Sequence, residues 1–383
     1  MDTNYIKNHI NYESRGETFN EVSKERLIEI LIDYYFNSLT LSKLIEKYNL
    51  NTNLKNIRSD FPNLTSNLKC QYDGNLMISK LPSKESVKFD IEESNYECIV
   101  CGHRQSINCR CDNCRKYYQQ IIKNHYENQN LDLVDLENIS LMDRLNISEI
   151  LQINHARSLE DITSDNKLNI QAYYELLAPL FDKNLLTISS NSTIESFKMA
   201  DNFPNVFYPT EVNFNININS SIDKLKFLTD ENLLSKYKSD EIKDVYKKIV
   251  ISELIKLLTI KMDEYNLKLV SRNEKEKNNI EDITNLFNRM LKTLSPGQIY
   301  SLIWKGTRDA NDSKDRNKWG NYKYHQLSFV LLKIDSVWKL YKNNNYEIKS
   351  FDIPYDYVKD LKTDIFFDFL LEKPNWFSEV INF

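Results

Sequence analysis

Glycine is scarce in this chain, at 6 of 383 residues, and the six stand far apart. Loops that cradle phosphate need several glycines close together, because backbone N–H groups must approach the ligand. Neither GxGxxG nor GxxxxGK(S/T) occurs, and the GxSxG turn of α/β-hydrolases is also absent. These absences disfavour nucleotide-dependent motors, dinucleotide oxidoreductases and α/β-hydrolases.

Long hydrophobic runs are also missing. No stretch approaches the roughly 18 apolar residues that span a bilayer, so we expect no membrane partner. The opening residues contain no apolar segment followed by a small-residue cleavage site, so we expect no secretory signal. The six cysteines are clustered, as metal ligands usually are, rather than distributed as a disulfide framework. Together these features predict a cytoplasmic protein.

The composition is otherwise that of a globular protein, with 41% hydrophobic and 27% charged residues. A chain of 383 residues is too long for one ordinary core. We expect three regions: a helical unit over residues 1–62, a cysteine-rich module over 63–130 and a mainly helical body over 131–383. A further boundary is expected near 220–240.

The first region has the periodicity of three helices. Apolar residues at spacings of three and four predict one helix within 21–37, and Thr40 can cap a second. A third short helix is expected over 53–60, ended by Phe61–Pro62. The phrase TLSKLIEKYNLN, residues 40–51, resembles the scaffold and turn of the helix-turn-helix superfamily.

That resemblance implies that the third helix enters the major groove of DNA. It would offer four side chains there: Asn53, Lys55, Asn56 and Arg58. The local charge argues against a phosphate-binding surface, because residues 1–60 hold eight basic and nine acidic side chains. A three-helix unit that packs or binds protein without touching DNA is the alternative, and both interpretations stay open.

The second region carries the most specific signal. Cys98–Ile99–Val100–Cys101–Gly102 is a zinc knuckle, in which a tight turn directs two thiolates at one ion and glycine tolerates the unusual backbone. Cys111–Asp112–Asn113–Cys114 is a second CxxC pair, and Cys109 lies beside it. Two such pairs supply the four ligands of one tetrahedral zinc. On this interpretation the segment resembles a zinc ribbon with a short loop.

A second interpretation places two zinc ions. Cys70–Gln71–Tyr72–Asp73–Gly74 has the form of a knuckle whose second cysteine is an aspartate. Alternating apolar residues at 76–78 and 87–91 predict a hairpin between it and the later knuckle. One ion would have the ligands Cys70, Asp73, Cys98 and Cys101, and the other His103, Cys109, Cys111 and Cys114. Carboxylate is an unusual ligand in structural sites, so one zinc and two both remain open.

We expect the metal to be structural, because a thiolate-saturated site is closed to water. The HxE and PCxxC segments of zinc deaminases are also absent. Positive charge surrounds the cysteines, and with neighbouring tyrosines it can form a nucleic-acid surface. The side chains concerned are Arg104, Arg110, Arg115 and Lys116. The alternative is the solvated basic face of an ordinary helix.

The third region is predicted to be mostly helical. Helices are expected over 140–156, 169–186, 240–266, 279–294 and 323–342, and another begins with a capping box at Ser295–Gln298. Alternation over 212–218 predicts a strand that pairs with 185–187 or 206–208. The fold class is therefore mainly α: a helix-turn-helix-like unit, a small β zinc ribbon and a large helical body with a short strand pair.

These features predict a zinc-containing subunit that recognises nucleic acid, or recruits a partner that does, within a larger bacterial assembly such as a mobile-element or antiviral defence system. One alternative is a protein–protein adaptor that binds no nucleic acid. Another is a Mg-dependent nuclease, since Asp335 with Glu347–Ile348–Lys349 has the D…ExK order of such enzymes. No catalytic residues are assigned, and we expect a binding protein rather than an enzyme.

Overall fold

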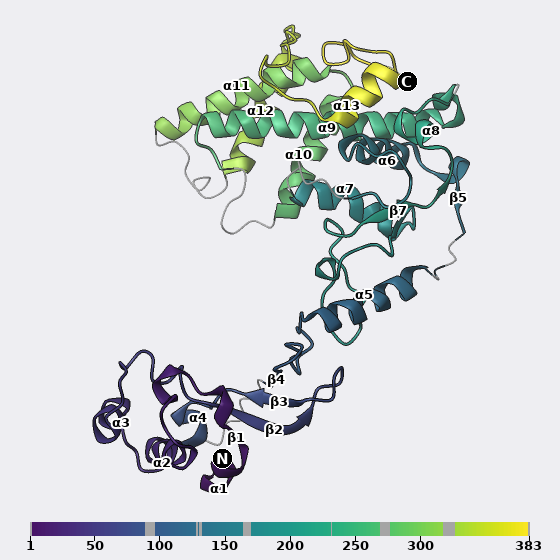
Figure 1. The fold of residues 1–383 in the computed structure, drawn as a ribbon. Coiled ribbons are helices and arrows are strands. Elements are labelled where there is room, and N and C mark those ends of the chain that lie inside the picture. The colour runs from purple at the N-terminus through teal and green to yellow at the C-terminus, as the bar shows by residue number, and fades with distance from the viewer. Residues whose placement is uncertain are drawn as a thin grey trace. The chain divides into compact units, whose positions relative to one another are not determined.

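The computed structural model describes residues 2–88, 96–127, 129, 132–163, 170–230, 232–268, 276–316 and 326–381 (Figure 1). The chain divides into two compact units. Unit 1 consists of Met1–Asn130 and Ile188–Phe214, and unit 2 of Leu131–Thr187 and Asn215–Phe383. The polypeptide therefore passes between the units more than once, and each unit is described by itself.

Unit 1 begins with three helices: α1 (Thr3–His9), α2 (Lys24–Tyr35) and α3 (Leu41–Tyr48). Short 3-10 turns, η1 (Tyr12–Ser14) and η2 (Glu17–Phe19), separate the first two. The helix predicted within 21–37 and the helix predicted to be capped by Thr40 are confirmed as α2 and α3, and the Thr40 side chain accepts the N–H of Lys43. Their apolar faces meet in one core that contains Leu27, Ile30, Leu31 and Leu44.

The predicted helix over 53–60 is wrong, because the structure forms successive turns from Leu54 to Asp60. The Asn53 side chain accepts the N–H groups of Lys55 and Asn56, which starts the turns. Asp60 is held by the opening segment, since its carbonyl accepts the Gly16 N–H and its carboxylate the Thr18 N–H. These long-range bonds and the proline at position 62 compete with a continuing helix.

A four-stranded antiparallel sheet follows, in the order β1–β2–β3–β4. Its strands are β1 (Ile10–Asn11), β2 (Asn63–Lys69), β3 (Leu76–Ser79) and β4 (Glu97–Cys98). The expected strand at 76–78 is confirmed. Its expected partner is not, because Val87 lies in a short helix, α4 (Lys84–Lys88), while Phe89 and Ile91 fall outside the described residues. The strand β4 takes that place beside β3.

Unit 1 closes with α5 (Asp112–Glu127) and the returning segment 188–214. Polar contacts join them along the helix. The Gln119 amide donates to the Ser192 carbonyl at 2.9 Å, and the Tyr126 hydroxyl donates to the Pro204 carbonyl at 2.8 Å. Arg115 pairs with Glu195, on the 3-10 turn η4 (Ile194–Ser196), at 3.6 Å. These contacts fix α5 from its first turn to its last.

Unit 2 is built mainly of helices, and α9, α11 and α12 lie side by side in it (Figure 1). The capping box at Ser295 and Gln298 is confirmed. No helix among the described residues is both long and apolar enough to cross a bilayer. The α-helices are α6 (Leu141–Ile153), α7 (Ile170–Asp182), α8 (Ile222–Lys226), α9 (Ser239–Glu264), α10 (Glu276–Met290), α11 (Pro296–Asp315), α12 (Gln326–Asn343) and α13 (Leu361–Asp364). The shorter turns are η3 (Leu136–Asn138), η5 (Leu233–Lys236) and the π-helical η7 (Ile365–Leu370).

The predicted strand over 212–218 is divided into two short strands with different partners. β7 (Phe214–Ile216) pairs with β6 (Leu186–Ile188), one of the two expected partners. β8 (Ile218–Asn219) pairs in parallel with β5 (Val134–Asp135). The other expected partner, around Phe207, makes an isolated bridge with Phe197 instead. A body that is mainly helical with short strand pairs is thus confirmed.

Asp33 joins α2 to α3, and its substitution gives the first testable prediction. Its carboxylate accepts hydrogen bonds from the Lys47 ammonium, the Asn37 amide and the Tyr48 hydroxyl. The bonds from Lys47 and Asn37 lower the pKa of Asp33 to about 2, against the opposing effect of burial. A depressed pKa contributes stability that is fully present above the unfolded value of about 3.9 and is lost as the pH falls toward 2.

We therefore expect Asp33→Asn to lower the melting temperature at pH 7 and to flatten its pH dependence between about pH 5 and 2. Thermal unfolding of the full chain, followed by circular dichroism across that pH range, measures both effects. Glu46→Gln, at an exposed position of α3, is the control that changes the same charge without touching this network. An Asp33→Asn profile parallel to that of the parent would contradict the prediction.

Candidate metal centres

Two loops of unit 1 have the same backbone geometry. In the first, the N–H of Cys70 donates to the carbonyl of Asn75, and the N–H of Gly74 donates to the carbonyl of Cys70. In the second, the N–H of Cys98 donates to the carbonyl of His103, and the N–H of Gly102 to that of Cys98. Position for position, the two loops are equivalent knuckles.

Glycine occupies the same position in both knuckles, with φ of 73° at Gly74 and 66° at Gly102. This left-handed conformation favours glycine, because a side chain would meet the adjacent backbone. The residue just before each glycine supplies the second ligand of a knuckle. Asp73 therefore stands where Cys101 stands in the other loop, which explains how a carboxylate enters this set.

The two knuckles face each other, since the ligand atoms of Cys70, Asp73, Cys98 and Cys101 all lie within 4.8 Å of one another. The sulfurs of Cys70 and Cys101 are 3.5 Å apart, and the Cys98 sulfur lies 3.1 Å from an Asp73 carboxylate oxygen. Two thiolates on one tetrahedral zinc lie about 3.8 Å apart, given a Zn–S distance of about 2.3 Å. A disulfide would need about 2.05 Å.

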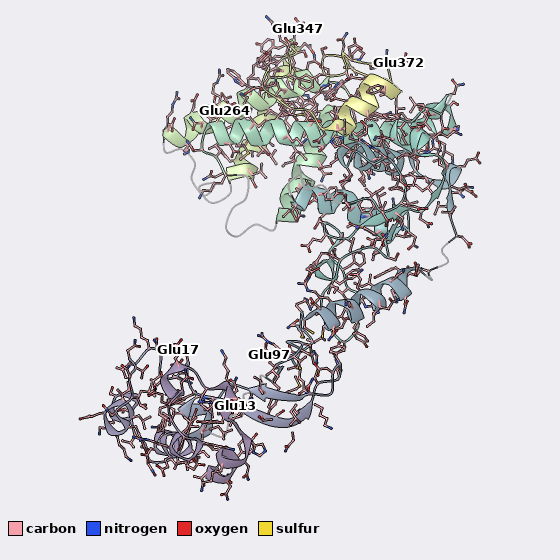
Figure 2. The ribbon with its side chains drawn as sticks, in the orientation of Figure 1. Glu13, Glu17, Glu97, Glu264, Glu347 and Glu372 are labelled. Atoms are coloured by element: carbon pink, nitrogen blue, oxygen red, sulfur yellow. The ribbon has the colours of Figure 1, made fainter. Side chains whose placement is uncertain are left out.

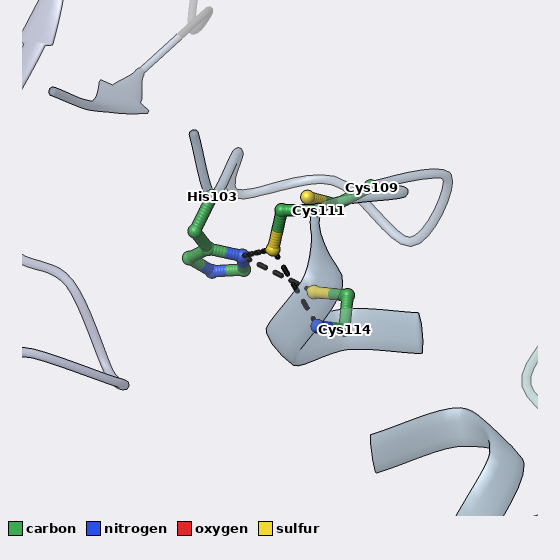
Figure 3. A group of neighbouring side chains, drawn as sticks. All are labelled: His103, Cys109, Cys111 and Cys114. Atoms are coloured by element: carbon green, nitrogen blue, oxygen red, sulfur yellow. Dashed lines mark hydrogen bonds between the residues drawn. The ribbon is translucent and has the colours of Figure 1, made fainter. Parts of the chain in front are cut away.

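The side chains of His103, Cys109, Cys111 and Cys114 form a second cluster within the same 4.8 Å limit (Figure 3). The Nδ1 atom of His103 is 3.2 Å from the Cys114 sulfur and 4.0 Å from the Cys111 sulfur. Three of the four residues are buried, and Cys111 is half-buried. Three thiolates and one imidazole are a common ligand set of structural zinc.

The start of α5 positions two of these thiols. Cys111 immediately precedes the helix, and its sulfur accepts the N–H of Cys114 at 3.5 Å, as an N-cap side chain does. The Cys109 sulfur accepts the N–H of Arg104 at 3.2 Å. Burial acts to raise the pKa of Cys109, but backbone hydrogen bonds from Arg104 and Cys111 outweigh it and lower that pKa to about 6. Cys109 thus favours the thiolate, the form that binds metal, whereas burial raises the pKa of Cys114 to about 12.

Tyr72 links the two clusters, and sequence reasoning did not single it out. It belongs to the first knuckle, yet its hydroxyl lies 3.3 Å from the sulfur of Cys114 in the second cluster. Its ring packs edge-on against His103, with centroids 4.9 Å apart. The sequence offers only its position between Cys70 and Asp73 as a signal. Through Tyr72, each cluster restrains the other.

The structure brings together the two sets of four residues named in the two-ion interpretation. It does not place Cys98 and Cys101 in one cluster with Cys111 and Cys114, as a single zinc ribbon would require. Each set offers four ligand atoms around one centre and could hold a metal ion. Because the sets are saturated with protein ligands, they are suited to folding rather than to activation of water.

The residues expected to contact nucleic acid lie in two places of unit 1. Arg58 and Arg104 line a common groove of about 530 Å³, whereas Asn53 caps the local turn described above. Lys55 and Asn56 are exposed on those turns. Near the start of α5, the Nε–H of Arg115 donates to the carbonyl of Arg110, and Lys116 is exposed.

The nuclease residues are not arranged as that hypothesis requires. Asp335 lies on α12, where it pairs with Lys339 at 2.6 Å and Arg289 at 3.3 Å. Glu347, labelled in Figure 2, lies with Lys349 in a segment after α12 that is not a strand. Ile348 between them is buried without joining a sheet. The Asp335 carboxylate is engaged by cations rather than directed at a metal.

Comparisons with protein-family models, with curated proteins and with solved structures find no match to this chain. Its function is therefore inferred from the two clusters and from the surface around them.

The ligand sets predict about two zinc ions per chain. Cys70→Ser and Cys109→Ser each remove a ligand of a different cluster, so each variant should retain about one ion, and the double variant almost none. Metal analysis of the purified, dialysed proteins gives these stoichiometries. A parent chain with one zinc, absent from both single variants, would show that the clusters form one site.

Asp73→Cys should strengthen the first cluster, because thiolate suits zinc better than carboxylate does and the knuckle geometry is already present. We expect zinc affinity there to rise by about tenfold or more. Competition with a chromophoric chelator, carried out in a Cys109→Ser background, isolates this cluster. Asp73→Ala in the same background should weaken the site, and equal affinity in all three chains would contradict the assignment of Asp73.

Proposed function

We propose that this chain binds two zinc ions that organise a nucleic-acid-binding surface on unit 1. It would act as a recognition or recruiting subunit of a larger bacterial assembly. The observation that supports nucleic-acid binding is a groove in which cationic side chains from separate segments converge: Arg58, Lys80 and Arg104. Arg58 and Arg104 are 46 positions apart, so their convergence is a property of the tertiary structure.

The groove holds about 530 Å³ and is formed by three parts of unit 1. Arg58 comes from the turns before β2, Lys80 follows β3, and Arg104 follows the second knuckle. Glu97 is the one acidic residue among the described residues that line it, and it pairs with Arg104 at 3.1 Å. Arg104 is exposed and Glu97 is half-buried, so solvent screens the pair and a phosphate can replace the carboxylate.

A second hollow, of about 300 Å³, continues the surface past Arg104, which lines both. It adds Lys69 and the aromatic rings of Tyr72, Tyr117 and Tyr118. Tyr117 is 55% exposed, which leaves its ring available for stacking. Proteins bind single-stranded nucleic acid with cationic side chains placed along its phosphate backbone. An exposed aromatic ring beside them lets a base stack.

The metal clusters position the central residue of this surface. Arg104 directly follows the ligand His103, and its backbone N–H donates to the sulfur of Cys109. Its side chain is left free of the metal and directed to the two hollows. Loss of zinc would therefore disturb nucleic-acid binding without removing any cationic side chain of the surface.

The recruiting role is supported by the tip of the second knuckle. Ile99 and Val100 lie between the ligands Cys98 and Cys101 and are 63% and 66% exposed. Two apolar side chains on a tip that metal would hold rigid suit contact with a protein partner. This feature agrees with a subunit that joins nucleic acid to a second protein.

The test is binding of the zinc-loaded protein to labelled duplex DNA, single-stranded DNA and single-stranded RNA across a salt series. Reversing three charges, in Arg58→Glu, Lys80→Glu and Arg104→Glu together, should weaken binding by about 100-fold or more. It should also reduce the salt slope by about one for each phosphate that is no longer neutralised. The matched control reverses Lys7, Lys24 and Lys43, which are exposed elsewhere in unit 1.

Each outcome decides between stated alternatives. The proposal is supported if the chain holds zinc and binds nucleic acid in a salt-sensitive way, and if only the groove variant loses that binding. Zinc without binding to any of the three probes overturns nucleic-acid recognition and leaves a protein–protein adaptor. An equal decrease in the groove variant and the control would show that binding depends on general charge and not on this groove.

A further inference from the structure

Unit 2 contains a polar pocket of about 490 Å³ that the proposed function does not use. It opens beyond the carboxyl ends of the parallel strands β5 and β8, whose following residues line it. The volume lies within the usual range of small-molecule sites, about 300–1,000 Å³.

The floor of this pocket carries a buried arginine that is only partly paired. Arg144 is 1% exposed. One terminal nitrogen donates to the Asp230 carboxylate at 2.7 Å and the other to the Leu136 carbonyl at 2.9 Å. Its Nε–H is buried and has no hydrogen-bond partner within the described residues. Since a guanidinium has donors only, this group requires an acceptor.

A second buried polar atom, on another residue that lines this pocket, is also without a partner in the described structure. This is the hydroxyl oxygen of Ser220, which follows β8 and lines the same pocket. Buried polar groups in native proteins are nearly always hydrogen-bonded, so two such atoms in one pocket indicate a missing partner. The ring of Tyr237, 5.7 Å from the guanidinium carbon, covers part of Arg144 and limits its movement.

Cationic side chains gather around the Asp230 carboxylate in this pocket. Three cations share the single carboxylate of Asp230, since Lys236 lies 3.7 Å and Lys224 4.0 Å from it, besides Arg144. Around Asp230 the cations therefore exceed the carboxylate by two, while Lys224 and Lys236 are exposed and the described lining as a whole holds three cations and three carboxylates. Two further carboxylates line the pocket, those of Asp135 and Glu137, and both residues are exposed at its edge.

We propose that this pocket binds a small molecule through one oxyanion group, a phosphate or a carboxylate. The oxyanion accepts from the Nε–H of Arg144 and the hydroxyl of Ser220, and it pairs with the ammonium groups of Lys224 and Lys236. The exposed carboxylates at the edge accept hydrogen bonds from hydroxyl or amino groups on the rest of the molecule. This site is separate from the metal clusters and does not depend on the nucleic-acid proposal.

The experiment uses the full zinc-loaded chain with inorganic phosphate and acetate as probes, and chloride at equal ionic strength as the reference. Thermal unfolding and calorimetric titration measure binding. We expect at least one probe to raise the melting temperature above the chloride value. Lys224→Gln with Lys236→Gln should weaken binding of that probe by about tenfold or more, because two charge-assisted hydrogen bonds are removed.

The matched control is Lys243→Gln with Lys248→Gln, at exposed positions of α9 outside the pocket. These substitutions should leave the affinity unchanged. Ser220→Ala tests the inner pocket without changing charge, and it should weaken binding while the protein remains folded. The relative affinities of phosphate and acetate identify which oxyanion the pocket prefers.

A direct readout follows the Nε–H resonance of Arg144 by nuclear magnetic resonance, assigned through its disappearance in Arg144→Lys. The proposal requires this resonance to shift when the probe is added. Two results would overturn it: stabilisation no greater than in chloride, which would leave water as the partner of these atoms, or binding that survives in the Lys224→Gln, Lys236→Gln variant.

Discussion

The arrangement of the two knuckles in unit 1 depends on candidate ligand atoms held close together around two centres. The apolar core between the knuckles has only Cys70, Met77 and Cys98 as buried members among the described residues, and two of these are candidate ligands. Thiolates and a carboxylate within 4.8 Å would repel one another unless a cation lay between them. The proposed zinc ions supply that cation and thereby replace a conventional core.

The candidate ligands also position side chains on the surface of unit 1. The sheet strand β4 ends at Cys98, the second knuckle leads to His103, and Arg104 follows at the junction of two hollows. Tyr72 joins the clusters, so a disturbance of either one reaches the other. Unit 2 is organised differently, by a large apolar core between its helices.

Local patterns were sufficient where an element depends on its own residues. The helices α2 and α3 follow from apolar spacing and a cap, and α11 from its capping box. The expected helix over 53–60 failed because Asp60 bonds to Gly16 and Thr18, which lie more than 40 positions away. The predicted strand at Val87 is wrong because its segment forms the helix α4, and β4 takes the place beside β3. Neither of these contacts with distant residues can be recognised in a short window of the sequence.

The candidate ligands could be identified from the sequence alone, because a knuckle needs its cysteines and its glycine at fixed short spacings. The same reasoning reached Asp73 as the counterpart of a cysteine. Only the tertiary structure decided how eight ligands divide into two sets, since that depends on which loops the sheet brings face to face. It also decided that Arg58 and Arg104 share a groove, and that Arg144 is buried with an N–H that has no partner among the described residues. The reason is that distances between remote residues are set by packing rather than by local pattern.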